Sequence, residues 1–197
     1  MKIYSKFEYK NMLRFQAAKD SFLFPLANIL LRLNIPANLV SIFSGIVAIL
    51  SLLFSVIFNT PLIFIIGIWS HLFLDGLDGS LARLSKKKPD ANGLIMDITF
   101  DSLGIATIGF YALYFNYINI LTALLFITTY LSVNMISYIF AKTDREYDFV
   151  VRPRIFVLVA ITLDYMFSFS TTFTAILISN ILLTVFLLIG IKKLYKL

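Results

Sequence analysis

The chain contains no cysteine, which excludes disulfide bridges, zinc–thiolate sites and thiol nucleophiles. Charged residues are also scarce: they make up 14% of the 197 residues, against 59% hydrophobic residues and a mean hydropathy of +0.88. This composition is wrong for a soluble domain and typical of an integral membrane protein. The 20 Phe and 10 Tyr residues are therefore expected on lipid-facing surfaces and in interfacial belts rather than in a ligand-stacking site.

A single all-α membrane domain, residues 1–197, is predicted, because no internal repeat, low-complexity tract or second domain is visible. Residues 1–35 are expected to form an interfacial N-terminal segment: a basic amphipathic helix, then an apolar run that Pro25 interrupts and that is too short to span. Residues 36–197 are expected to form a polytopic core of six transmembrane helices. The six spans are predicted at residues 38–58, 61–84, 93–115, 118–141, 153–169 and 171–191.

The basic residues lie on one side of these spans. All 17 Lys and Arg residues fall in the N-terminal segment, around the loops that follow the second and fourth spans, or at the C-terminus. The positive-inside rule then places both termini in the cytoplasm of a multi-pass protein of the cell membrane. The net charge of +6 is thus explained by membrane orientation, and no nucleic-acid partner is expected.

Four aspartates interrupt the apolar pattern near the loop between the second and third spans. Asp75 and Asp78 are three residues apart, and Asp97 and Asp101 are four apart, so each pair projects from one helix face. An Asp at the bilayer centre costs about 2.5–3.5 kcal/mol, a cost that indicates a function. Oxygen ligands at this density suit Mg²⁺ or Mn²⁺, and two ions are expected. The sequence therefore predicts a metal site near the cytoplasmic face.

Eight residues around these aspartates resemble the signature of the CDP-alcohol phosphatidyltransferases. The signature reads Asp75-x-x-Asp78-Gly79-x-x-Ala82-Arg83, followed by Gly93-x-x-x-Asp97-x-x-x-Asp101. Nine residues separate Arg83 from Gly93, one more than in the usual form, and the extra residue falls in the polar loop. Upstream, Pro36-x-Asn38-x-x-Ser41 is similar to the family's entry into the first span, with Ala37 inserted and Ser41 in place of Thr.

The resemblance implies a metal-dependent membrane enzyme of phospholipid biosynthesis. Such an enzyme transfers a phosphatidyl group from a CDP-linked lipid of the CDP-diacylglycerol type to a small polar alcohol, releases CMP, and is expected to form a homodimer. The metal ligands implied are Asp75, Asp78, Asp97 and Asp101. Asp101 is also the expected base that deprotonates the acceptor hydroxyl. The CDP-lipid contacts implied are Asn38, Ser41, Gly79, Ala82 and Arg83.

Other polar residues leave more than one interpretation open. Arg152 and Arg154, just before the fifth span, fit a pocket for a phosphorylated acceptor such as glycerol phosphate or inositol phosphate, and they also fit simple topology anchors. His71 lies one helical turn before Asp75. We expect it to pack or to hydrogen-bond, and the alternative is that it joins the metal ligands.

Two functions other than phosphatidyl transfer are also compatible with the sequence. Within the family, a CDP-choline or CDP-ethanolamine type of phosphotransferase would act on diacylglycerol. Outside it, a divalent-cation transporter would line its path with carboxylates, but it should also carry polar or Gly/Pro-broken helices to the far side of the membrane. Here the carboxylates gather near one face and the outer halves of the spans are apolar, which favours the enzyme.

Overall fold

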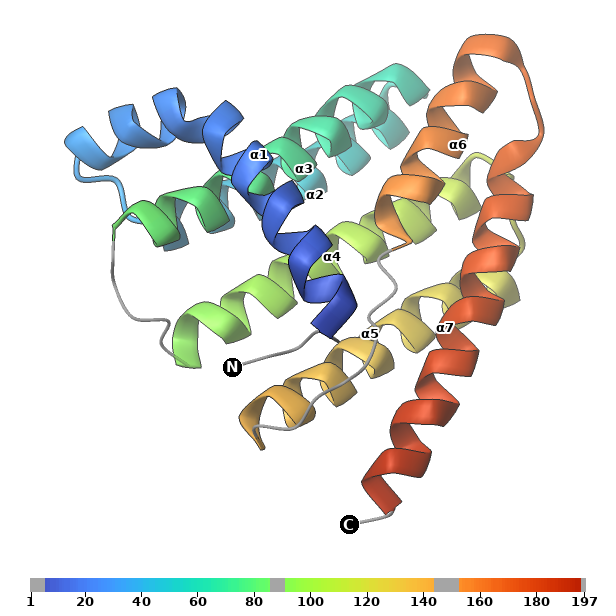
Figure 1. Cartoon of the computed structure of the whole chain (residues 1–197). Coiled ribbons are helices and arrows are strands. Elements are labelled where there is room, and N and C mark those ends of the chain that lie inside the picture. The colour runs from blue at the N-terminus through green and yellow to red at the C-terminus, as the bar shows by residue number, and fades with distance from the viewer. Residues whose placement is uncertain (1–5, 86–90, 144–152, 196–197) are drawn as a thin grey trace. The chain divides into compact units, whose positions relative to one another are not determined.

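The computed structural model describes residues 6–85, 91–143 and 153–195, and within these ranges the chain forms helices and no strand (Figure 1). The helices are α1 (Lys6–Arg32), α2 (Ala37–Ile57), α3 (Pro61–Leu84), α4 (Ala91–Tyr114), α5 (Ile120–Lys142), α6 (Arg154–Phe167) and α7 (Thr171–Tyr195). Side chains are described throughout these ranges except at 6–13, 15, 91, 92, 94, 97, 141 and 142. The predicted all-α class is confirmed, and α2 to α7 match the six predicted segments to within four residues at each end.

The chain divides into two compact units, residues 10–104 and residues 105–197 together with the first nine. The first unit holds most of α1, all of α2 and α3, and the first part of α4. All four signature aspartates belong to it. The second unit holds the rest of α4 and helices α5 to α7.

Asparagine ends three of the helices. Asn34, Asn59 and Asn116 have positive φ angles of 56°, 48° and 60°, the left-handed conformation that Asn tolerates better than other non-glycine residues. After α2, the Thr60 N–H donates to the Ser55 carbonyl at 2.9 Å and the Asn59 N–H to the Val56 carbonyl at 3.2 Å. These bonds satisfy carbonyls that the end of a helix would otherwise leave unpaired. The short turns expected from the sequence therefore have a local cause.

Small residues bring α2, α3 and α4 close together within the first unit. A Cβ added to Gly67 of α3 would overlap Ser51 of α2, and one added to Gly45 of α2 would overlap the ring of Phe100 of α4. Small side chains allow membrane helices to approach closely and to gain van der Waals contact. These contacts fix the helices that carry the aspartates.

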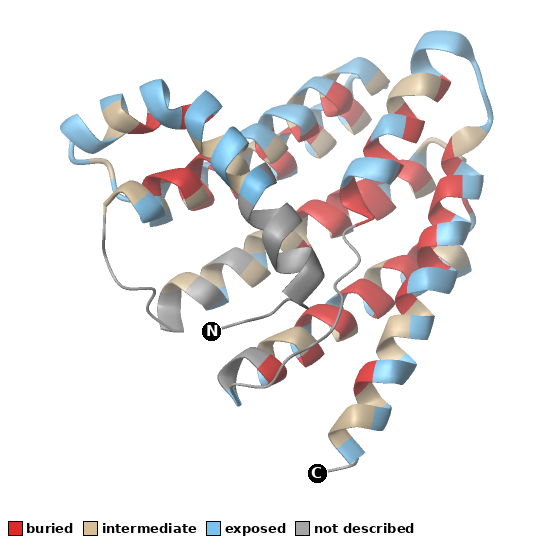
Figure 2. Ribbon diagram, viewed as in Figure 1, coloured by how far each residue is buried: buried red, intermediate tan, exposed pale blue. Residues whose placement is uncertain are grey.

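The packing of α2 is opposite to that of a helix in a water-soluble protein. Its buried positions are mostly small: Val40, Ser41, Ser44, Gly45, Ala48, Ser51 and Ser55. Its exposed positions include Leu39, Ile42, Phe43, Ile46, Leu50 and Phe54. Figure 2 shows the same alternation along α7, whose exposed residues include Phe173, Leu177 and Ile181. Large apolar side chains on the outside indicate a lipid surrounding.

Within the part of the chain that the structure describes, four helices are long and apolar enough to cross a membrane: α2, α3, the Ile120–Phe140 part of α5, and α7. In α4 the described apolar stretch is shorter, Ile98–Tyr114, and α6 has only 14 residues. These four helices indicate that the chain is a membrane protein. The expected total of six spans stays a prediction.

The N-terminal helix differs from the prediction at Pro25. We expected an interruption there, but α1 continues through Pro25 to Arg32 and bends along its length (Figure 1). Proline lacks an N–H and so removes one helical hydrogen bond, which bends a helix without necessarily ending it. On either side of the proline, Leu23 and Ala27 are buried in one apolar cluster. The other buried members of that cluster are Val40, Leu77 and Leu81. Packing against α2 and α3 therefore offsets the lost bond.

In the second unit, Asp164 joins the end of α6 to the start of α7. Its carboxylate accepts hydrogen bonds from the Thr171 N–H at 2.7 Å, the Thr171 hydroxyl at 2.6 Å and the Thr172 N–H at 2.8 Å. These are first-turn groups of α7, which have no partners inside their own helix. The aspartate has a structural role that explains its burial.

Candidate active site

Asp78 and Asp75 project from the C-terminal half of α3. Asp78 is buried, with 7% of its surface exposed, and Asp75 is half-buried. The Ser41 hydroxyl of α2 donates to Asp78 Oδ2 at 2.5 Å, a short charge-assisted hydrogen bond. Two residues to which the family resemblance gives separate roles, one at the nucleotide and one at the metal, are therefore in direct contact. This bond orients the Asp78 carboxylate from the neighbouring helix.

Asp97 and Asp101 lie on α4, one helical turn apart. Asp101 is half-buried, and the side chain of Asp97 is outside the described part of the structure. Among the side chains that are described, no three Asp, Glu, His or Cys residues come close enough to hold a metal ion. With Asp97 outside that set, the predicted four-carboxylate site stays a prediction.

His71 of α3 contacts both α2 and α4. The residue is fully buried, its Nδ1 lies 2.7 Å from the Ser44 hydroxyl of α2, and that hydroxyl also donates to the His71 carbonyl at 3.0 Å. A Cβ added to Gly104 of α4 would collide with the other side of the imidazole ring. His71 therefore hydrogen-bonds and packs, as expected, between α2 and α4.

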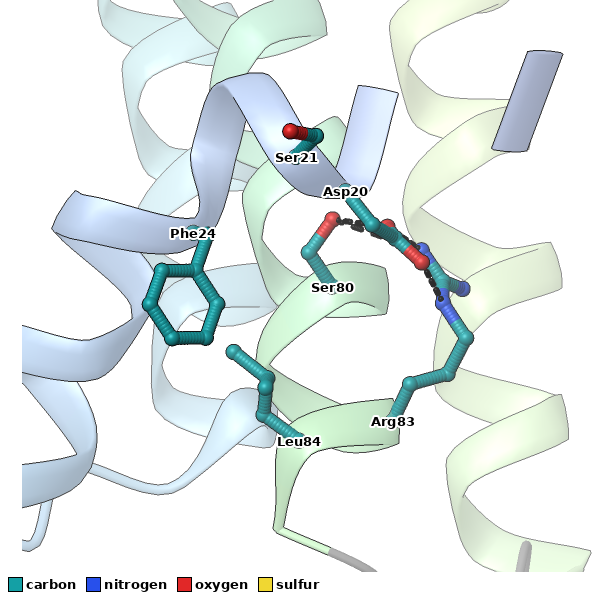
Figure 3. Close-up of a pocket in the computed structure, with 6 residues that line it drawn as sticks. All are labelled: Asp20, Ser21, Phe24, Ser80, Arg83 and Leu84. Atoms are coloured by element: carbon teal, nitrogen blue, oxygen red, sulfur yellow. Dashed lines mark hydrogen bonds and ion pairs between the residues drawn. The ribbon is translucent and has the colours of Figure 1, made fainter. Parts of the chain in front are cut away.

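Arg83 is held by an aspartate of the N-terminal helix (Figure 3). Its Nε donates to Asp20 Oδ2 at 2.8 Å and its Nη2 to Asp20 Oδ1 at 2.5 Å, a bidentate pair. The Ser80 hydroxyl donates to Asp20 Oδ1 at 2.6 Å. The hydrogen bonds from Arg83, with that from Ser80, hold the pKa of Asp20 below its ordinary value although partial burial opposes the shift.

A cavity of about 340 Å³ opens beside this ion pair. Its lining is part polar and part apolar and comes from α1 and α3: Asp20, Ser21, Phe24, Ser80, Arg83 and Leu84 (Figure 3). A charged edge next to an apolar wall suits a molecule that has a polar head and an apolar body.

The other predicted nucleotide contacts lie near this end of α3 or at the start of α2. Gly79 faces the guanidinium of Arg83, because a Cβ built on it would lie 3.3 Å from Arg83 Nη1. Ala82 is exposed, and so is Asn38 in the first turn of α2. Two of these positions thus remain open to a ligand.

The predicted acceptor residues belong to the second unit. Arg154 is the first residue of α6 and is 6% exposed, which is unusual for an arginine. Arg152 lies outside the described residues. The acceptor site therefore stays a prediction, with one buried cation as its structural feature.

Sequence reasoning missed Asp20. A weak signal was present, since Asp20 and Glu8 are the only acidic residues among the first 35, in a segment that is otherwise basic. A pairing across 63 positions has no local pattern that would reveal it.

Comparison with known proteins gives a family and a fold. The sequence model of the CDP-alcohol phosphatidyltransferase family matches residues 33–191. No curated protein matches the sequence significantly. The fold is similar to that of Mycobacterium tuberculosis phosphatidylinositol phosphate synthase (PgsA1). The crystal structure of that protein with CDP-DAG bound has a TM-score of 0.70 and 18% identity over 86% of this chain and 92% of that chain. Its complex with manganese and citrate has a TM-score of 0.74 and 17% identity over 88% of each chain.

Proposed function

The chain belongs to the CDP-alcohol phosphatidyltransferase family, and from this premise we propose that it transfers a phosphatidyl group from CDP-diacylglycerol to a phosphorylated polyol. It is a transferase of phospholipid biosynthesis, and the family's CDP-linked chemistry makes CMP the leaving group. The observation that carries the proposal is the complete signature, whose first half ends α3 and whose second half begins α4, within one compact unit.

The contact between His71 and Gly104 supports a common site for the four aspartates. Residues 71, 75 and 78 lie on one stripe of α3, and residues 97, 101 and 104 lie on one stripe of α4. The two helices are joined by residues 85–90 and run in opposite directions (Figure 1). A helix rises about 1.5 Å per residue. Measured along the helix axes from the contact of His71 with Gly104 toward the loop, Asp75 lies about 6 Å away and Asp101 about 4.5 Å. Asp78 and Asp97 both lie about 10.5 Å away. This register favours two facing pairs of carboxylates.

The donor set fits divalent metal ions. Carboxylate oxygens are the ligands that Mg²⁺ and Mn²⁺ prefer, and Ser41 already orients the carboxylate of Asp78. We assign the ligands as Asp75, Asp78, Asp97 and Asp101, for two ions of Mg²⁺ or Mn²⁺. Bound ions would neutralise the charge that develops on the diphosphate. A similar fold has been crystallised with manganese, which supports the assignment.

The protein's own groups then carry the reaction. Asp101 accepts the proton of the acceptor hydroxyl, and the resulting oxygen attacks the phosphorus that bears the diacylglycerol. A new P–O bond forms to the acceptor, the bond within the diphosphate breaks, and CMP leaves. Gly79 lets the nucleotide approach the backbone of α3, and Arg83 beside it places a guanidinium where phosphate oxygens need donors. Asn38, Ser41 and Ala82 complete the CDP-lipid site in this proposal.

The acceptor is proposed to be a phosphorylated polyol such as glycerol phosphate or inositol phosphate, bound by Arg152 and Arg154. Arg154 supports this, because it is a buried cation and a guanidinium recognises phosphate oxygens through charge-assisted hydrogen bonds. The similar fold of a phosphatidylinositol phosphate synthase points the same way.

In the proposed topology, α2 to α7 all cross the membrane, α1 lies at the cytoplasmic interface, and both termini and the active site face the cytoplasm. A homodimer is also part of the proposal.

CMP release from the purified protein tests this function. The protein in mixed micelles is given CDP-diacylglycerol with inositol phosphate, glycerol phosphate, inositol or no acceptor, first with EDTA and then with Mg²⁺ or Mn²⁺ restored. We expect release only with metal and a phosphorylated polyol. A parallel reaction with CDP-choline and diacylglycerol tests the rival phosphotransferase. Metal uptake into vesicles without CMP release from any pair of substrates would instead identify a transporter.

A further inference from the structure

The ion pair between Asp20 and Arg83 joins the N-terminal helix to the signature. The guanidinium of Arg83 can bind an anion along its Nε–Nη2 edge or along its Nη1–Nη2 edge, and Asp20 occupies the first of these. Nη2 also lies 3.3 Å from the Ser80 hydroxyl, which itself bonds Asp20. Asp20 and Ser80 therefore fix the plane of the guanidinium from the α1 side.

The remaining nitrogen of Arg83 points toward the proposed nucleotide site. Among the residues that the structure describes, Nη1 has no hydrogen-bond partner, and it lies beside Gly79, where a Cβ would be 3.3 Å away. A side chain at Gly79 would therefore crowd Nη1. Asp20 therefore holds the guanidinium by its Nε–Nη2 edge, while Nη1 lies beside Gly79, a signature residue that has no side chain.

Stability does not account for this arrangement. The side chains of Arg83 and Asp20 are 38% and 33% exposed, and exposed ion pairs contribute little to folding. An arginine on a flexible stem that is already oriented loses less conformational freedom when it binds a phosphate. Preorganisation of Arg83 is the effect that this geometry supplies.

We propose that Asp20 is a positioning residue for the nucleotide site: it orients Arg83 so that Nη1 meets the diphosphate of the CDP-lipid beside Gly79. The proposal rests on the function proposed above. It gives α1 a part in substrate binding, and it places the cavity next to the ion pair along the path of a molecule with an anionic head and an apolar body.

The opposite arrangement would make Asp20 a competitor. A carboxylate that must leave Arg83 before the diphosphate can bind would weaken binding, and its removal would strengthen it. Asp20 bonds Nε and Nη2, whereas Nη1 lies beside Gly79. This argues for positioning, because the Asp20 carboxylate and the diphosphate would contact different atoms of the guanidinium.

Steady-state kinetics of Asp20→Asn separate the two arrangements. We expect the KM for CDP-diacylglycerol to rise about tenfold, with the KM for the acceptor unchanged, because the lost charge-assisted bonds act only through Arg83. Asp20→Glu should recover part of the affinity, since it restores the carboxylate. The control on the same helix is Asn28→Ala, which changes a polar side chain two turns from the pair and should leave both constants at their wild-type values.

Direct titration with CDP in the presence of Mn²⁺ measures the same effect without turnover. Asp20→Asn should weaken CDP binding about tenfold, and in an Arg83→Lys background, where the bidentate pair cannot form, it should have little further effect. Unchanged or tighter CDP binding by Asp20→Asn would overturn the proposal. Absence of CMP release from the wild-type protein would overturn the proposed function instead, whatever the titration shows.

Discussion

Replacing Gly104 by alanine should disturb the candidate active site from one turn away. The new Cβ would overlap the His71 ring, which cannot move freely because Ser44 holds Nδ1 at 2.7 Å and no part of the ring is exposed. Alanine favours a helix over glycine by about 1 kcal/mol. Forcing a methyl group into a packed interior costs about 1–3 kcal/mol, and a strained buried hydrogen bond adds about 1 kcal/mol. The net expectation is a loss of about 2 kcal/mol of stability.

The matched control is Gly76→Ala on α3. A Cβ there would lie 3.6 Å from Leu23 Cδ1, an ordinary contact, so the helix propensity should act alone and stabilise the protein slightly. In thermal unfolding followed in detergent, Gly104→Ala should melt about 4–8 °C below wild type, and Gly76→Ala at or above it. Because His71 lies one turn from Asp75, the metal concentration for half-maximal CMP release should also rise in Gly104→Ala. If Gly104→Ala melted no lower than Gly76→Ala, the contact between α3 and α4 at His71 would be wrong.

Three further predictions concern single carboxylates. Asp101→Asn should lower CMP release at least about 100-fold while CDP still binds, because the variant loses only the base; near-normal turnover would remove Asp101 from that role. The pKa of Asp20 is lowered by its bonds to Arg83. The contribution of Asp20 to CDP affinity is therefore complete above the ordinary aspartate pKa and is lost as pH falls through the lowered value. The difference in CDP affinity between wild type and Asp20→Asn should therefore hold from pH 7 to 5 and shrink only below about pH 4; a loss near pH 6 would contradict this. Asp164→Ala should destabilise the protein by about 2–3 kcal/mol, because it leaves the Thr171 and Thr172 N–H groups without their acceptor, and an unchanged melting temperature would show that water replaces it.

The helices could be predicted from the sequence because their causes are local. Apolar runs of membrane length set α2 and α3, and an asparagine in the left-handed conformation ends α2 at the expected turn. The number of spans could not be settled in the same way. α6 has 14 residues, fewer than the bilayer needs, and its role depends on its surroundings rather than on its composition.

Part of the candidate site could also be predicted, since spacing alone places Asp75 with Asp78 and Asp97 with Asp101 on helix faces. The partners of these residues could not. The bond from Ser41 to Asp78 joins positions 37 apart, and the pair of Asp20 with Arg83 depends on α1 continuing through Pro25. Contacts between distant segments follow from tertiary packing, which no local pattern encodes. The interruption predicted at Pro25 was wrong for the same reason, because the packing of α1 keeps the helix continuous there.

The buried face of α2, with the small residues Ser44, Gly45, Ala48, Ser51 and Ser55, is here called the serine seam. It makes the pairing of α2 with α3 insensitive to the solvent outside. Ser44, Ser51 and Ser55 bond within the protein, while the bulky residues of α2 lie on its exposed side. Replacing exposed residues of α2 such as Phe43, Ile46 and Leu50 by glutamate or lysine would therefore leave the packing of α2 against α3 intact. A detergent-free version of the protein could be sought by redesigning that outer face alone, with the serine seam kept as it stands.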